Sequence, residues 1–345
     1  MIPIQNIYYM LSYAFQVLNE QCYKNIATEQ FNNTGELIAA ILEKGIAIQI
    51  KRGLGKEYIL QTEALSSLQG KIDIAESIKT QSMLRKQLIC TYDEFSVNSI
   101  MNRIIKSTVE LLLRSNISKQ RKKNLRKLMV YFSEVDFIDL YTVNWNVQYN
   151  RNNQTYRMLI SICYLVVKGL LQTQSNGHTK LMDFLDEQRM CRLYEKFILE
   201  YYRREFKNQI TTNASQIPWQ LDNEENSMLP VMQSDIMLQS GEKVLIIDAK
   251  YYEHSTQVQF DKHTLHSGNL YQIFTYVKNK EYELREKDHT VSGMLLYAKT
   301  DEEIYPNNVY QMSGNQITVR TLDLNLPFDE IAGQLNTIAK THFDL

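Results

Sequence analysis

The sequence has few cysteines, and none of them are arranged as a metal site or a disulfide framework would require. Only four occur among the 345 residues, and they are widely separated, at Cys22, Cys90, Cys163 and Cys191. Cysteine-rich zinc sites need closely spaced pairs, and small secreted domains need several bridges. The chain is also long enough to bury a core without disulfides. We therefore expect a reducing, cytoplasmic location.

A long hydrophobic run is also missing. The most apolar stretch, from Met158 to Leu171, contains Lys168 and is shorter than the roughly 20 residues that a spanning helix needs. The first residues lack the basic flank and the small-residue cleavage site of a signal peptide. We therefore expect no membrane segment.

There is no excess of positive charge. Lys and Arg number 38 against 39 Asp and Glu, for a formal net charge of −1. Any surface that neutralises nucleic-acid phosphates must then be local. The densest basic segment runs from Lys119 to Lys127. It is either a solvated helix face or a contact surface for DNA or for an acidic partner.

Nucleotide-hydrolysis and nucleophile motifs are absent as well. The pair Gly55-Lys56 has Ile50 five residues before the glycine and Glu57 after the lysine, so it does not match G-x-x-x-x-G-K-[ST]. No Ser/His/Asp or Cys/His arrangement stands out. If this chain works with a nucleotide-driven motor, that motor is another protein.

One acidic and basic pattern does stand out in the second half. Asp235 is followed thirteen positions later by Asp248-Ala249-Lys250, at the end of an apolar, β-branched run that begins at Lys243. The turn signal Gln239 to Glu242 predicts a hairpin. Side chains alternate along a strand, so Asp248 and Lys250 share one face. Asp235, on the neighbouring strand, is then able to approach Asp248.

Two carboxylates and an ammonium group suit hydrolysis of a phosphodiester. Carboxylate oxygens are hard ligands that bind Mg²⁺, which often takes only one or two protein carboxylates beside substrate phosphates. The lysine can position an attacking water or stabilise the transition state. The alternative interpretation is an exposed ion pair at the end of a strand.

Two helical segments extend the pattern. Asn269 to Tyr276 predicts a helix that places Gln272 and Tyr276 on one face, at i and i+4. Upstream, Leu193 to Glu205 is a strongly amphipathic helix that could bring Glu195 or Glu200 to the same metal ion. Each of these acids alone is also consistent with a solvated helix charge.

Together these elements resemble the PD-(D/E)XK nuclease fold, in its branch with a Gln-x-x-x-Tyr motif. The resemblance implies Asp235, Asp248 and Glu195 as metal ligands, with Lys250, Gln272 and Tyr276 completing the catalytic site. Ser234 stands where that motif usually has proline. The proline supplies no metal ligand, so the departure is tolerable.

Further segments resemble the McrC family, the nuclease subunit of McrBC restriction systems. The similarity covers nearly the whole chain, and its most specific parts lie in different halves. The matching segments are Asn6-Ile-Tyr-Tyr-Met-Leu11, Lys51-Arg-Gly-Leu54, Gly70-Lys-Ile-Asp73, Asn102-Arg-Ile-Ile-Lys-Ser-Thr108 and Ile247-Asp-Ala-Lys-Tyr-Tyr252.

The resemblance implies a Mg²⁺-dependent endonuclease subunit of a GTP-dependent complex directed at 5-methylcytosine in double-stranded DNA. It implies a partner, a McrB-like AAA+ GTPase hexamer that binds the GTP, and an amino-terminal part that inserts into this ring and stimulates GTP hydrolysis. Two alternatives remain open. One is mainly a structural activator of the ring with weak nuclease activity, and the other is a stand-alone DNA repair nuclease.

The expected architecture is α/β: a mixed α+β amino-terminal domain over residues 1–175, which binds the partner, and a nuclease domain with a central mixed sheet flanked by helices over residues 176–345. The polar segment Gln172 to Lys180 is the expected linker. Short strands are expected at Ala47 to Lys51 and at Tyr58 to Gln61. The aromatic residues Tyr8, Tyr9, Tyr13 and Phe15 form either core or a partner interface.

Overall fold

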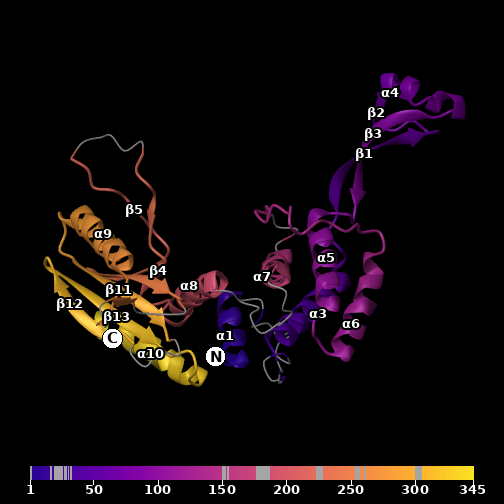
Figure 1. The fold of residues 1–345 in the computed structure, drawn as a ribbon. Coiled ribbons are helices and arrows are strands. Elements are labelled where there is room, and N and C mark those ends of the chain that lie inside the picture. Colours follow the sequence, from indigo (N-terminus) through magenta and orange to yellow (C-terminus); the bar gives the residue numbers. More distant parts are fainter. Residues whose placement is uncertain are drawn as a thin grey trace. The chain divides into compact units, whose positions relative to one another are not determined.

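The computed structural model describes residues 2–15, 18, 26, 29, 31, 33–149, 153, 155–175, 187–222, 228–252, 257–259, 262–299 and 305–345 (Figure 1). Two compact units follow from the contacts: Met1–Ala27 with Leu185–Leu345, and Thr28–Phe184. This differs from the expected division at residue 175, because the opening segment packs in the same unit as the carboxy-terminal half. Part of the expected linker, through Ser175, continues a helix, and 176–180 lie outside the described residues.

Helix α1 (Ile4–Ala14) is held in the carboxy-terminal unit by hydrogen bonds and ring contacts. The Asn6 amide donates to the carbonyl oxygens of Leu324 and Leu326, at 2.7 and 2.8 Å. The ring of Tyr9 stacks on Phe328 with the centroids 4.4 Å apart. Further contacts join Tyr8 to Leu18, Tyr13 to Phe197 and Tyr201, and Phe15 to Lys196. These aromatic residues therefore pack within their own unit, where Tyr8 is buried and the other three are partly buried.

The central sheet of this unit has six strands in the order β12-β13-β11-β8-β7-β4. Strand β11 runs parallel to both β8 and β13, and the other pairs are antiparallel. The sheet is therefore mixed, as predicted. Its strands are β4 (Thr211–Asn213), β7 (Ile236–Ser240), β8 (Lys243–Lys250), β11 (Thr290–Ala298), β12 (Asn308–Met312) and β13 (Asn315–Leu322).

Helices flank this sheet, and Figure 1 shows α9 and α10 on opposite sides of it. The helices are α8 (Glu187–Glu205), α9 (Ser267–Leu284) and α10 (Phe328–Phe343). Val244 and Ile246 of β8 are fully buried in a core shared with Ile273 and Val277 of α9. Two short hairpins complete the unit, β5 (Gln216–Ile217) with β6 (Met232–Gln233) and β9 (Gln257–Gln259) with β10 (Lys262–Thr264).

The second unit is a helical body with one projecting sheet. The body consists of α3 (Thr34–Arg52), α5 (Ile100–Arg114), α6 (Lys119–Met129), the 3₁₀ turn η4 (Val130–Phe132) and α7 (Tyr156–Ser175). The prediction of a strand from Ala47 to Lys51 is wrong, because helix α3 continues through Arg52. Its isoleucines suggested period-two alternation, but Leu42, Ile46 and Gln49 are buried at helical spacing.

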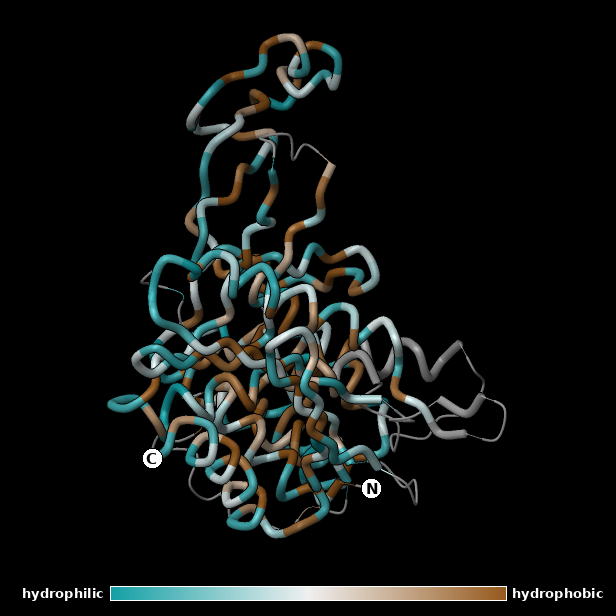
Figure 2. Tube along the Cα trace, turned by 90° about the vertical axis from the view of Figure 1, so that its left-hand side faces the viewer, coloured by the Kyte–Doolittle hydropathy of each residue, from teal (hydrophilic) through white to brown (hydrophobic). Residues whose placement is uncertain are grey.

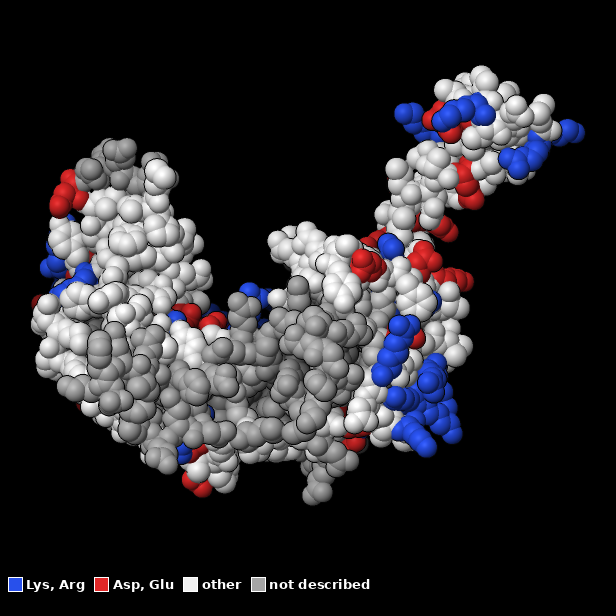
Figure 3. All heavy atoms as spheres, in the orientation of Figure 1, with Lys and Arg blue, Asp and Glu red and all other residues white. Residues whose placement is uncertain are grey.

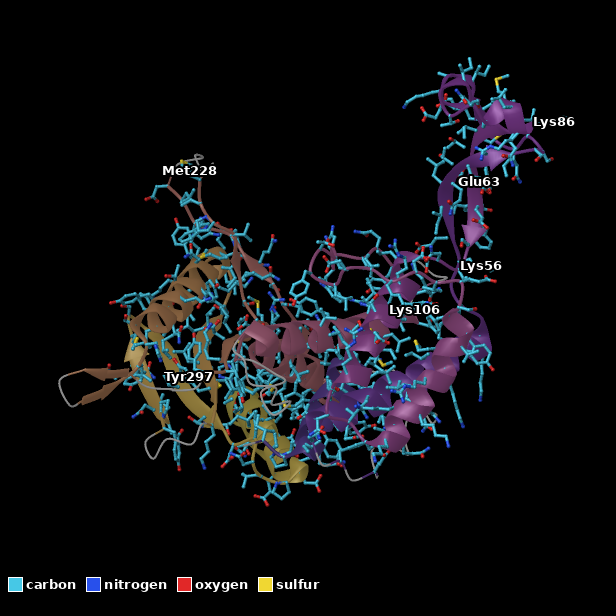
Figure 4. All side chains as sticks on the ribbon, turned by 45° about the vertical axis from the view of Figure 1, so that its right-hand side comes forward. Lys56, Glu63, Lys86, Lys106, Met228 and Tyr297 are labelled. Atoms are coloured by element: carbon cyan, nitrogen blue, oxygen red, sulfur yellow. The ribbon has the colours of Figure 1, made fainter. Side chains whose placement is uncertain are left out.

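The projecting sheet, which we call the arm, covers residues 57–96. Strand β1 (Glu57–Leu65) pairs antiparallel with β3 (Leu88–Ser96), and β2 (Lys71–Asp73) joins β3 on its other side. Helix α4 (Ile74–Lys79) and the turn η3 (Ser82–Arg85) lie at its tip. Figure 4 labels Glu63 and Lys86 along the arm, and Figure 2 shows hydrophobic residues distributed over it. The sequence predicted Tyr58 to Gln61, in the first half of β1, and did not predict β3.

Gly70 fixes the start of β2 against β3. Its φ is +64°, and a Cβ there would lie 2.3 Å from the carbonyl oxygen of Thr91. Only glycine adopts this conformation at no steric cost and allows so close an approach.

Within the described residues, no helix is both long and apolar enough to cross a membrane.

Candidate active site

The β7–β8 hairpin brings the two predicted aspartates together. Ile236 pairs with Ile247 in antiparallel register, so Asp235, just before β7, stands across from Asp248 on the same side of the sheet. The Asp235 side chain accepts a hydrogen bond from the backbone N–H of Ala249, at 2.9 Å. Asp235 is thereby fixed beside the Asp-x-Lys strand.

Asp248 and Lys250 form a buried ion pair on the α9 side of β8. The Lys250 Nζ lies 2.8 Å from Asp248 Oδ2, and the two side chains are 14% and 1% exposed. Burial favours the neutral amine, but the Asp248 and Asp235 carboxylates raise the pKa of Lys250 above its ordinary value. The lysine is therefore charged at neutral pH. The alternative of an exposed surface ion pair does not agree with this burial.

Helix α9 supplies the two residues of the Gln-x-x-x-Tyr motif. The Lys250 Nζ donates to Gln272 Oε1 at 3.3 Å, and the Gln272 amide donates to the Tyr276 hydroxyl at 2.9 Å. The spacing of four residues places the two side chains one above the other on the helix. A continuous chain of hydrogen bonds thus runs from Lys250 to Tyr276.

Of the two acids on α8 that the sequence suggested for the site, Glu195 is directed toward it. The charges of Lys250 and Asp248 both influence its pKa, which burial raises above the ordinary value. Its carboxylate also accepts a hydrogen bond from the Cys191 thiol at 3.1 Å. Glu200 instead pairs with Arg203 at 2.7 Å. At about 100° per residue, five residues leave the two side chains about 140° apart around the helix, so the two acids face different directions.

The crowding of carboxylates perturbs Asp235 most clearly. Burial raises its pKa from 3.8 to about 8, and the charges of Asp248 and Glu195 act in the same direction. Burial also raises the pKa of Asp248. Carboxyl groups that are this reluctant to ionise are typical of sites that bind a cation or exchange protons.

The donor set fits a hard divalent cation that keeps part of its water shell. Neither carboxylate oxygen of Asp248 accepts a well-aligned hydrogen bond among the described residues, although both are buried. Among these residues, no three His, Cys, Asp or Glu side chains gather closely enough to hold a metal by themselves. Two carboxylates with open positions match Mg²⁺ better than a closed site of the zinc type.

A second polar network next to Lys250 was not predicted. Tyr297 of β11 pairs with Lys250 in the parallel register, and its hydroxyl accepts from the Asn269 amide at 2.9 Å. Tyr252 donates to the other end of that amide at 3.2 Å. Asn269 lies three residues before Gln272 on α9, which is the one signal in the sequence for its position. Figure 4 labels Tyr297 in the sheet.

A family model and a curated relative both match this chain to the McrBC restriction system. The family described as McrBC 5-methylcytosine restriction system component matches residues 5–298. The chain is 30% identical over 329 residues to the type IV methyl-directed restriction enzyme EcoKMcrBC of Escherichia coli (strain K12), covering 94% of this chain and 93% of that protein.

Two assemblies from Thermococcus gammatolerans contain chains of similar structure. The first is a half-complex of McrB AAA+ hexamers with bound McrC, with a TM-score of 0.49 and 18% identity over 97% of this chain and 76% of that one. The second is the cryo-EM McrBC complex, with a TM-score of 0.42 and 20% identity over 59% of each chain.

Proposed function

The chain belongs to the family of McrBC 5-methylcytosine restriction system components, and from this premise we propose that it is the subunit that cuts double-stranded DNA. The observation that supports the proposal most is the meeting of Asp235 and Asp248 beside the buried, charged Lys250. The reaction is hydrolysis of a phosphodiester bond. Its cofactor in this proposal is Mg²⁺.

Each residue has a distinct part in this proposal. Asp235 and Asp248 would hold the metal ion, with Glu195 next to them. Magnesium, when bound, supplies Lewis-acid stabilisation of the charge that develops on a phosphate. Lys250 adds a fixed positive charge at the same place and can orient the attacking water. Gln272 holds the Lys250 amine, and Tyr276 holds Gln272.

The arm supports a second role, binding of a partner. Tyr58, Leu60 and Leu84 are 74%, 67% and 82% exposed, and most of the arm's other large apolar side chains are exposed as well. Apolar side chains concentrated on one exposed element mark an interaction site. We propose that the arm engages a McrB-like AAA+ GTPase hexamer and stimulates it. The partner would bind the GTP, since this sequence lacks a P-loop, and would recognise 5-methylcytosine.

The test uses this chain purified with its GTPase partner. Methylated and unmethylated DNA are incubated with GTP and Mg²⁺, and cleavage and GTP hydrolysis are measured for the wild type and for Asp248→Ala. We expect the variant to lose cleavage and to keep its stimulation of the GTPase. A variant that cuts at the wild-type rate would refute the site.

The same assay separates the alternatives. A wild type that stimulates GTP hydrolysis without cutting would identify a structural activator. Cutting that needs neither the partner nor GTP would identify a stand-alone nuclease. Omitting Mg²⁺ is the control for the metal, and we expect no cleavage without it.

A further inference from the structure

Helix α6 carries a row of basic side chains along one side. Lys119, Lys122, Lys123, Arg126 and Lys127 stand at i, i+3, i+4, i+7 and i+8, which is one face of an α-helix. We call these five residues the basic stripe. Four of them are exposed and Lys122 is partly buried. Figure 3 shows Lys and Arg gathered over this helix.

The opposite side of α6 holds the helix in place. Leu125 is fully buried. The Arg121 guanidinium binds the Glu43 carboxylate at 2.8 Å and also contacts Glu29 at 2.5 Å. Asn124 donates to Glu43 at 2.9 Å. The acids around α6 are therefore directed to Arg121, on the inner side, and not to the basic stripe.

The basic stripe is electrostatically unbalanced within the described residues. No ion pair joins any of its five side chains to a carboxylate there, and α6 itself contains no acidic residue. Like charges at i and i+4 destabilise a helix. An ordinary solvated helix interleaves acids with its bases, as Glu110 and Arg114 do on α5. The arrangement therefore favours an anionic partner over a solvated face.

We propose that the basic stripe binds the phosphate backbone of duplex DNA. From Lys119 to Lys127 the helix rises about 12 Å, and a duplex carries about one negative charge per 1.7 Å of its axis. Over that length a duplex carries about seven phosphates on its two strands together, so the charge density of the DNA is comparable to that of the basic stripe. The contact is independent of base sequence, because Lys and Arg on phosphates position a protein without reading bases. This inference rests on the proposed function, and it adds a DNA contact in the unit that lacks the nuclease site.

Salt-dependent binding of the full-length chain tests the stripe. A fluorescein-labelled duplex of mixed sequence is titrated without divalent cations, so that no cleavage occurs, at salt concentrations from about 50 to about 200 mM. The test variant carries Lys119→Gln, Lys123→Gln and Lys127→Gln. The control carries Lys51→Gln, Arg52→Gln and Arg114→Gln, three exposed cations of the same unit with an equal change of charge.

We expect the stripe variant to bind on the order of tenfold or more weakly, and its log–log salt slope to fall by about 1 for each lysine that contacts a phosphate. The control should keep a slope close to the wild type. Equal losses in both variants, or no loss in the stripe variant, would overturn the inference. So would unchanged DNA binding with loss of partner association, because this would assign the stripe to an acidic protein surface.

The nuclease assignment and the basic stripe can be refuted independently of each other. If the wild type with its partner cuts DNA and the stripe variant binds DNA normally, only the stripe is refuted. If the wild type does not cut even at saturating DNA, the nuclease assignment is refuted whatever the stripe does. Circular dichroism of both triple variants, with the wild-type spectrum expected, shows that a binding loss does not come from unfolding.

Discussion

Asn102 and Asp248 are buried polar residues in the segments that resemble the McrC family, but their environments differ. Asn102 is buried and fully used: its amide donates to Gly55 and Val97 carbonyls, and its oxygen accepts from the Tyr156 hydroxyl at 2.7 Å. Asp248 is equally buried, but among the described residues its Oδ1 accepts nothing. Burying a polar group without a partner costs free energy. Asn102 is therefore explained by its contacts within the chain, whereas Asp248 pairs with Lys250 through Oδ2 and keeps Oδ1 without a hydrogen bond among the described residues.

The raised pKa of Asp235 predicts how stability depends on pH. In the metal-free chain this carboxyl keeps its proton up to about pH 8, against 3.8 ordinarily. The folded state then binds more protons than the unfolded state between these values, so this group's contribution is full below about pH 4 and is lost as pH rises to about 8. In thermal melts with EDTA, Asp235→Asn should lose less stability than the wild type over this range. If the melting temperatures of the two proteins change in parallel with pH, the raised pKa of Asp235 is contradicted.

Metal binding should reverse that loss. At pH 8, adding Mg²⁺ is expected to raise the melting temperature of the wild type, because an ion that binds only the folded state stabilises it. Asp235→Asn should respond much less. An equal response of both proteins would show that the ion binds elsewhere.

Gln272 acts on the reaction through Lys250. Gln272→Ala removes the acceptor that lies 3.3 Å from the lysine amine, and we expect cleavage to slow by about tenfold to hundredfold through misplacement of the charge. Tyr276→Phe removes only the hydroxyl that accepts a hydrogen bond from the Gln272 amide, so we expect it to slow cleavage less. Single-turnover cleavage at saturating DNA measures both. A larger effect of Tyr276→Phe would reverse the proposed order of support.

At the level of elements, the site depends on how closely α9 lies on the sheet. Gly293 of β11 faces this helix, and a Cβ there would lie 2.8 Å from Ile273 and 2.9 Å from both Val277 and Ile317. These neighbours are fully buried, so the core has no room for a methyl group. The absence of a side chain at Gly293 therefore allows α9, which carries Gln272, to pack closely on the sheet that carries Lys250.

Gly293→Ala should push α9 outward. We expect a loss of about 1 to 3 kcal/mol in the free energy of unfolding, typical of overpacking, together with slower cleavage. Gly268→Ala is the matched control, since nothing lies within 4 Å of a Cβ at that position in the first turn of α9. Urea unfolding of both variants measures the stability. A tolerated Gly293→Ala would mean that α9 is not held at this distance by the core.

The arm is anchored at its base by Asn102. The Tyr156 hydroxyl accepts from the Gly55 N–H at 2.7 Å, and Asn102 binds both the Gly55 carbonyl and that hydroxyl. Asn102→Ala would leave these buried groups unpaired, and we expect a cost of about 1 to 3 kcal/mol. Limited proteolysis should then cut near residues 53–56 sooner than in the wild type. Unchanged proteolysis would show that other contacts hold the arm.

For the whole molecule, sequence order and spatial order differ. Helix α1 opens the chain but packs with α8 and α10, on contacts such as Asn6 with Leu324 that span over 300 residues. Local patterns do not encode contacts of this range. The continuous division at residue 175 missed them for that reason, whereas the mixed sheet and its flanking helices were predicted correctly.

The sequence predicts those parts of the candidate site that depend on local geometry. Period-two alternation and a short turn are enough to place Asp235 beside Asp248 and Lys250, and helical spacing relates Gln272 to Tyr276. The Asn269–Tyr297 contact was missed, because it depends on the parallel register of β11 against β8, across the whole of α9. The catalytic and metal-binding roles of the site residues remain predictions.

In the proposed mechanism Asp235 and Asp248 act as one site in cleaving DNA, and a double-mutant cycle measures the coupling between them. DNA cleavage rates are measured for Asp235→Asn, Asp248→Asn and the double variant, with the partner, GTP and Mg²⁺ present. Residues that act as a unit give strongly non-additive losses, so the double variant should be little slower than either single variant. Independent losses that multiply, or a single variant that cuts at the wild-type rate, would contradict the claim.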